Sequence, residues 1–235
     1  MRVRQIPLRH LASSCDGASA IEFSLVLPVL ILVMLAGLQI TLYVNATRKV
    51  ENVATSIGQM ISEASPPSNT TTIATVNAAD IHFSYDSTLV LFPYIMNDAT
   101  QKNIPWWQDI NIDYASINFN PIAGASCSSY DQSACYTANV VWTSAGTAGT
   151  NYRHCGSTQT AVDDTVPPSS TTLPRSVFGP GSIIAIDVVF NFVPRFGPRF
   201  LPSIRIARSV FLQPRYASLI NYDTKNNDGI ASPCP

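Results

Sequence analysis

A single apolar run near the N-terminus limits what this chain can fold into. No charged residue occurs from Leu25 to Val44. A helix of that length is ~30 Å long at ~1.5 Å per residue, which matches the hydrocarbon thickness of a bilayer. A short leader, residues 1–17, precedes the run and carries Arg2, Arg4 and Arg9. The sequence therefore predicts one membrane-spanning helix over residues 25–44.

The charges that flank the apolar run predict its orientation. The leader arginines favour a cytoplasmic N-terminus, because positive residues are retained on that side of the membrane. Arg48 and Lys49, on the other side of the run, oppose this orientation. The leader is too short to be a folded domain, however. We therefore expect a single-pass protein with a cytoplasmic N-terminus and a C-terminal domain in the periplasm or outside the cell.

The cysteines and the composition agree with an exported domain. Charged residues make up only 12% of the chain, against ~25% in ordinary globular proteins. Cys15 lies in the leader, and an even number of cysteines follows the span, which predicts two disulfides in an oxidising compartment with three possible connectivities. We favour the nearest pair, which leaves the other two cysteines to each other. The favoured pairs are Cys127 with Cys135 and Cys155 with Cys234.

The helix is expected to continue beyond the membrane as far as Ala64. Apolar residues recur there at helical spacing with charged residues between them, which is typical of a helix with one buried side. Pro66 and Pro67 then exclude a helix, and Pro28 is expected to bend or locally open the span. The apolar positions after the span are Ala46, Val50, Val53, Ala54, Ile57, Met60 and Ile61.

The rest of the chain, residues 65–235, is predicted to be β-rich, with a long irregular loop over 144–181. The fold class is α+β, a long N-terminal helix (18–64) followed by an antiparallel sheet domain. A change of alternation between Tyr114 and Ile117 suggests a β-bulge. The expected strands are Ile81–Leu91, Asp109–Phe119, Cys135–Thr143, Ser182–Val193 and Ser203–Leu212.

Few residues indicate a catalytic, metal-binding or nucleic-acid-binding site. Nucleophile-elbow, zinc-protease and nucleotide-binding motifs are all missing from the sequence. A zinc site using His154 and Cys155 is the alternative to the disulfides, but it lacks a C-x-x-C pair. The net charge of −1 leaves no electrostatic footprint for a nucleic acid. We expect no enzyme activity, cofactor, metal, nucleic acid or small-molecule substrate.

An arginine cluster near the C-terminus is the one concentration of charge. Val188 to Tyr222 contains no acidic residue. Such a cluster can dock partner subunits or anionic lipid headgroups, and a solvated basic strand pair is the plainer interpretation. The residues are Arg195, Arg199, Arg205, Arg208 and Arg215.

The most informative acid is Glu22, at the mouth of the apolar run. An ionised carboxylate at the edge of the hydrocarbon costs about 2 kcal/mol or more, so it needs a partner unless it reaches interfacial water. Glu22 is followed by Phe23, and Gly17 precedes it by five residues. The full string reads GASAIEFSLVLPVLILVMLAGLQITLYV.

This string resembles the N-terminal signature of TadE/TadG-like pseudopilins of the tight-adherence (Tad/Flp) pilus system. The resemblance implies cleavage between Gly17 and Ala18 by a membrane-embedded prepilin peptidase. It also implies that Glu22, with Phe23 beside it, pairs with the new amine of Ala18 in a neighbouring subunit. The expected fold is pilin-like, and the expected partners are the bacterial inner membrane, the prepilin peptidase, other Tad/Flp assembly proteins and pilin-like subunits.

The resemblance therefore favours a non-enzymatic, membrane-anchored pseudopilin or minor pilin-like component in the assembly of a Flp-type adhesive pilus. One alternative is an uncleaved bitopic protein that binds a secretion or envelope complex in the periplasm. A periplasmic enzyme is disfavoured because no catalytic constellation is visible.

Overall fold

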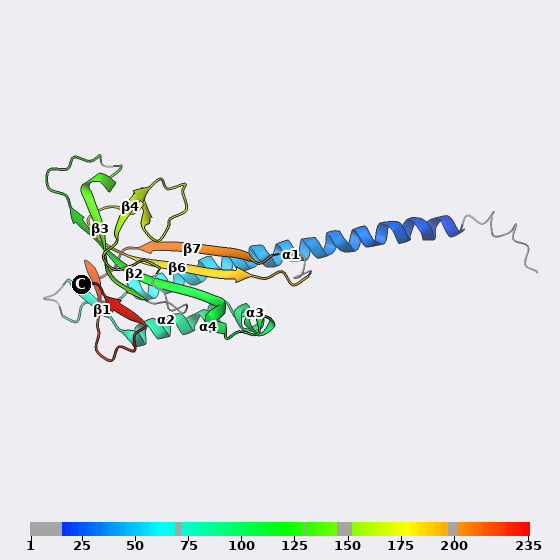
Figure 1. Cartoon of the computed structure of the whole chain (residues 1–235), viewed down its shortest axis with the longest axis horizontal. Helices are drawn as coiled ribbons and strands as arrows, with labels where there is room; N and C mark the ends of the chain where they lie inside the picture. Colours follow the sequence, from blue (N-terminus) through cyan, green and yellow to red (C-terminus); the bar gives the residue numbers. More distant parts are fainter. Residues whose placement is uncertain (1–15, 69–71, 129, 145–151, 197–201) are drawn as a thin grey trace, which may run out of the picture.

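One long helix dominates the molecule. The computed structural model describes residues 16–68, 72–128, 130–144, 152–196 and 202–235. Helix α1 (Asp16–Ser62) projects far beyond the domain on its N-terminal side (Figure 1). It continues through Pro28 without interruption, where the sequence suggested a bend or opening. It ends at Ser62, just before the two consecutive prolines.

The segment after α1 is more helical than the sequence analysis predicted. It holds β1 (Ile73–Val76), α2 (Ala78–Leu91), α3 (Tyr94–Lys102) and α4 (Trp106–Asp109). The predicted strand over 81–91 is therefore wrong.

Helix α2 begins at a capping box that the strand prediction overlooked. The Asn77 side chain accepts hydrogen bonds from the amides of Ala79 and Asp80, and the Asp80 carboxylate accepts one from the Asn77 amide. This reciprocal arrangement satisfies amides that otherwise lack partners at a helix start. The buried positions have helical spacing and are Ala78, Ile81, Ser84, Tyr85 and Thr88.

The central sheet is mixed, whereas the sequence predicted an antiparallel sheet: its strands pair antiparallel except for β4 with β5. Its order is β5-β4-β3-β2-β6-β7, and β9 also pairs with β3. Two pairs are parallel, β1 with β8 and β4 with β5. The α+β fold class is confirmed. The strands are β2 (Ile110–Pro121), β3 (Tyr136–Ser144), β4 (Thr158–Val162), β5 (Thr172–Pro174), β6 (Gly181–Phe192), β7 (Ile204–Leu212), β8 (Leu219–Tyr222) and β9 (Ala231–Pro233).

Two details of the sheet refine the predictions. The register of β2 against β3 shifts between Ser116 and Ile117, at the place where the sequence suggested a bulge. The predicted loop over 144–181 contains β4, β5 and the short 3-10 helix Arg175–Val177. A second 3-10 helix, Ser133–Cys135, leads into β3.

The sheet is covered on both faces, which gives two apolar clusters. The larger cluster lies between the sheet, the C-terminal half of α1 and the helical segment 78–109. The smaller cluster lies on the opposite face and includes Ile117, Leu173 and Ile183. Of the apolar stripe predicted on α1, all positions except Met60 are buried: Ala46, Val50, Val53, Ala54, Ile57 and Ile61.

The helix approaches the sheet closely at Gly58. A methyl group added there would lie 2.6 Å from Leu212 and 3.5 Å from Ile186. Glycine at this position therefore lets α1 lie against β6 and β7.

Truncation of the stripe should unfold the domain more readily. We expect Ile57→Ala to lower the free energy of unfolding by about 2–5 kcal/mol, because it leaves a cavity under a fully buried side chain. Urea unfolding of the full chain in mild detergent measures this change. Asn52→Ala, on the exposed side of α1, is the matched control and should change it by less than about 0.5 kcal/mol. Equal effects of the two variants would contradict the packing described here.

Candidate functional site

The predicted processing junction lies in the first turns of α1. Gly17 and Ala18 belong to the helix that begins at Asp16. The side chains of Glu22 and Phe23 are exposed, and no ion pair within the described part of the chain includes Glu22. The carboxylate is therefore open to a partner outside this chain.

The helix that follows the predicted junction has a surface suited to an apolar environment. From Ile21 to Leu38 its side chains are exposed, except for the partly buried Leu35. Its hydroxyl groups bond inside the helix, with Ser24 donating to the Ile21 carbonyl (2.8 Å) and Thr41 to the Gly37 carbonyl (2.9 Å). Such bonds lower the cost of placing a hydroxyl in hydrocarbon. By length and composition α1 is the one helix of the described chain that qualifies as a membrane span.

Comparison with known proteins bears on this same segment. The family model described as TadE-like protein matches residues 17–57. This segment of the chain is therefore similar to TadE-like proteins. The match includes the junction, the apolar half of α1 and most of the stripe that packs on the sheet, whereas the sheet itself lies outside it. No curated protein and no solved structure matches the chain.

The family match indicates a component associated with the Tad pilus. It implies association with other Tad pilus proteins in the membrane, and the exposed apolar half of α1 can serve as a single-pass anchor. TadE-like proteins are structural components of the pilus system, not a known enzyme family. Among the described residues, no three His, Cys, Asp or Glu side chains form a group able to hold a metal ion.

The arginine cluster is spread along β7. Arg205 and Arg208 line one groove of about 300 Å³ together with Tyr152. Arg195 lies before β7, with its guanidinium 5.3 Å from the centre of the Tyr94 ring. Arg215 lies after β7 and pairs with Glu63 at 2.8 Å. Arg199 lies outside the described residues, so the structure brings together two of the five arginines.

Both disulfides join the pairs that the sequence analysis favoured. One links Cys127 to Cys135, and the other links Cys155 to Cys234. The second bridge fastens the chain that leads into β4 to the C-terminal end of the molecule, where the amide of Cys234 also donates to the carbonyl of Val141 in β3 (2.7 Å).

Removal of the two disulfides should have unequal effects. Their sequence separations are 8 and 79 residues. Loop-closure entropy predicts a loss of about 2–3 kcal/mol for Cys127→Ala/Cys135→Ala and about 4–5 kcal/mol for Cys155→Ala/Cys234→Ala. Urea unfolding of each double variant under non-reducing conditions tests the order. If peptide mapping of the parent chain finds these cysteines free to react, the two disulfides do not form and the prediction fails.

A buried ion-pair network was missed by the sequence analysis. Arg153, almost fully buried, donates to the Asp187 carboxylate through Nε (2.8 Å) and Nη2 (3.2 Å). Its Nη1 donates to Gln159 at 2.6 Å, and Ser209 also donates to Asp187. A buried charge is tolerated only when such partners compensate its lost hydration. The overlooked signal was an aspartate in the middle of the apolar strand 182–193.

Asp113 lies directly across the β2–β6 pairing from Asp187. Burial and the neighbouring Asp187 charge raise the pKa of Asp113 to about 7, although the Asn111 amide donates to its carboxylate at 2.6 Å. Burial disfavours the charged form of Asp113, and Arg153 pairs with Asp187 and not with Asp113, so Asp113 stays protonated at pH values at which a solvated aspartate is ionised.

The Asp113 site should make stability depend on pH. Its pKa in the folded chain, about 7, exceeds the usual value of 3.8. The folded state therefore binds the proton more tightly, and this site loses stability as pH rises from about 4 to about 7. We expect Asp113→Asn to flatten the change in unfolding free energy between pH 5 and pH 8, measured by urea titration. An unchanged slope would show that the carboxylate is ionised throughout.

Two further ionic contacts were also not predicted from the sequence. Lys102 pairs with the buried acids Asp98 and Asp109, and burial raises the pKa of Asp109 to about 6. His82 contacts Asp228, and this hydrogen bond holds the pKa of Asp228 below its usual value. Asp98 and Lys102 are four residues apart in α3, whereas the contact between His82 and Asp228 joins different parts of the chain and had no local signal in the sequence.

Proposed function

We propose that this protein is a membrane-anchored pseudopilin, a minor pilin-like component that acts in assembly of a Flp-type adhesive pilus. The observation that carries the proposal is the free half of α1, which exposes an apolar surface and the carboxylate of Glu22 five residues after Gly17. A helix with this surface needs either lipid or neighbouring helices around it.

Processing would supply the missing partner of Glu22. Cleavage after Gly17 by a prepilin peptidase gives Ala18 a charged amine at the membrane interface. Glu22 of one subunit then pairs with the Ala18 amine of the next. This contact offsets the lost hydration of both groups and sets the axial register between adjacent helices.

Close helix packing is also possible within the span. Gly37 has open space where a side chain would project, so a neighbouring backbone can approach it closely. Packing of this kind would be available to a pilin-like subunit, and it is not required of a plain anchor.

The proposed topology places the leader in the cytoplasm and the sheet domain in the periplasm. The leader arginines Arg2, Arg4 and Arg9 support this orientation, although the leader through Cys15 lies outside the described residues. The two disulfides of the sheet domain support an oxidising compartment.

N-terminal mass spectrometry combined with one substitution tests the proposal. The chain is expressed in cells that carry a Tad system, its prepilin peptidase and a deletion of the chain's own gene. We expect a mature N-terminus at Ala18. Glu22→Ala should leave cleavage and membrane insertion intact and lower surface pilus yield, because the amine loses its partner. Glu51→Ala, an exposed acid on the domain half of α1, is the matched control.

Two results would overturn the proposal. A mature N-terminus at Met1 in those cells would exclude processing and favour the uncleaved envelope protein. Unchanged pilus yield with Glu22→Ala would exclude pairing of Glu22 with a neighbouring subunit.

A further inference from the structure

The sheet domain already contacts α1 within the apolar run, several residues before that run ends. The amide of Phe196 donates to the Gln39 side chain at 3.4 Å, and the rings of Tyr43 and Phe192 meet edge-on at 5.8 Å. Both contacts lie inside the apolar run Leu25–Val44. The part of α1 free of the domain is therefore Ile21–Leu38.

This overlap fixes the distance between the domain and a bilayer. Ile21–Leu38 spans ~27 Å at ~1.5 Å per residue, close to the ~30 Å hydrocarbon core. Gln39 to Val44 would add ~9 Å of apolar helix that already contacts the domain. If α1 spans the bilayer, the end of the domain that holds α3, the end of β6 and the start of β7 must lie in the membrane interface (Figure 1).

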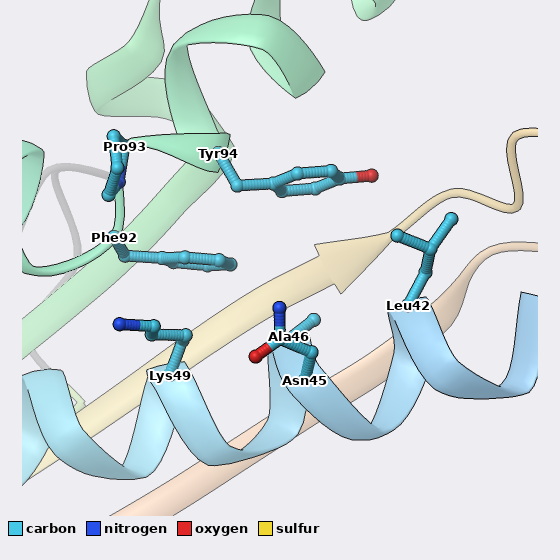
Figure 2. A pocket seen from close by; sticks show the side chains of 7 residues that line it. All are labelled: Leu42, Asn45, Ala46, Lys49, Phe92, Pro93 and Tyr94. Carbon is cyan, nitrogen blue, oxygen red and sulfur yellow. The ribbon is translucent and has the colours of Figure 1, made fainter. Parts of the chain in front are cut away.

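Two apolar grooves open at this end, on neighbouring faces of α1. One, of about 210 Å³, lies between the helix and the strand ends, and it exposes almost no polar surface; its lining residues are Gln39, Ile40, Tyr43, Phe192, Pro194, Pro202 and Ile204. The other, of about 170 Å³, lies below the stacked rings of Phe92 and Tyr94 (Figure 2). Phe196 and Ile204, beside the first groove, remain exposed by 43% and 40%.

The charged groups around these grooves are mainly cationic. Lys49 lines the second groove, and Figure 2 shows its ammonium group on the same side of α1 as the two rings. Arg195 lies over Tyr94, and Arg48 is exposed on α1 nearby. The acids at this end, Asp98 and Asp109, are buried and already paired with Lys102. The nearest exposed acid on α1 is Glu51, beyond the grooves.

We propose that this end of the domain is a lipid-docking surface that binds an anionic phospholipid. An acyl chain occupies the groove beside Tyr43, and the phosphodiester is bound by Arg195 and Lys49. Apolar side chains that enter the interface together with nearby cations are typical of surfaces that bind anionic membranes. Lipid is the occupant indicated here, because the grooves are continuous with the apolar surface of the span.

Quenching by brominated lipid tests the depth of this surface. The full chain, as Phe196→Trp, is placed in nanodiscs of phosphatidylcholine and phosphatidylglycerol in equal amounts, with acyl chains brominated. Subtraction of the parent chain isolates the added tryptophan. We expect roughly half of its emission to be lost, since interfacial residues lie about 5–10 Å into the headgroup and acyl boundary.

The matched control is Tyr130→Trp, an exposed position between β2 and β3. That connection lies at the opposite end of the sheet, because Phe119 pairs with Gly181 at the start of β6. The control should keep its emission. Ile204→Trp replaces Phe196→Trp if near-ultraviolet circular dichroism shows that the first variant is misfolded. Equal quenching at the two ends would overturn the proposal.

A second measurement tests the anionic headgroup. In the same mixture, bromine is placed on only one of the two lipids. Brominated phosphatidylglycerol should quench Phe196→Trp more strongly than brominated phosphatidylcholine, and Arg195→Gln/Lys49→Gln should abolish the difference. Lys225→Gln, an exposed cation after β8, should preserve it. Equal quenching by the two lipids in the parent background would overturn anionic recognition. These measurements need no pilus, so they are independent of the proposed assembly function.

Discussion

The packing of α1 on the sheet is the contact on which the rest of the structure depends. Its buried stripe, centred on Val53 and Ile57, lies against β6 and β7 and belongs to the larger apolar cluster. That cluster also includes β1, β8 and the helical segment 78–109. Without α1 the sheet would expose one apolar face, and the sheet domain would lose much of its core.

The C-terminal part of the chain fastens the end of α1 and β1 to the sheet domain. The amide of Arg215 donates to the Ser62 carbonyl at 2.9 Å, and the amide of Ser218 donates to the Thr72 carbonyl at 2.7 Å. Strand β8 then pairs with β1 in parallel. Residues far apart in sequence thus fasten both sides of the proline loop after α1, and the disulfide at Cys234 fixes the end that follows.

Sequence patterns predicted the parts of the fold that depend on local periodicity. The apolar run, the stripe on α1 and the strands β2, β3, β6 and β7 all have a clear period of helix or strand. Helix α2 was predicted as a strand because Ile81, Phe83 and Tyr85 alternate, yet Phe83 is exposed and the capping box at Asn77 sets a helix start. The local cap outweighed a short alternation.

The candidate site residues likewise fall into those that form a local sequence motif and those that meet only in the folded chain. The residues of the proposed junction, Gly17 and Glu22, could be picked out from the sequence because they are adjacent to the span and belong to one short motif. The network of Arg153, Asp113 and Asp187 could not be assembled from sequence, since its members meet only through the β2–β6 register and a connection from another part of the chain. Isolated acids in apolar strands were the one visible trace.

The continuity of α1 has a mechanical consequence. The domain half of the helix runs alongside β6 and β7 (Figure 1), so tension along the helix axis loads this interface in shear. Many contacts then resist together, whereas a perpendicular pull would peel them apart in succession. A subunit pulled out of a membrane by its helix would therefore move together with its sheet domain as one rigid body.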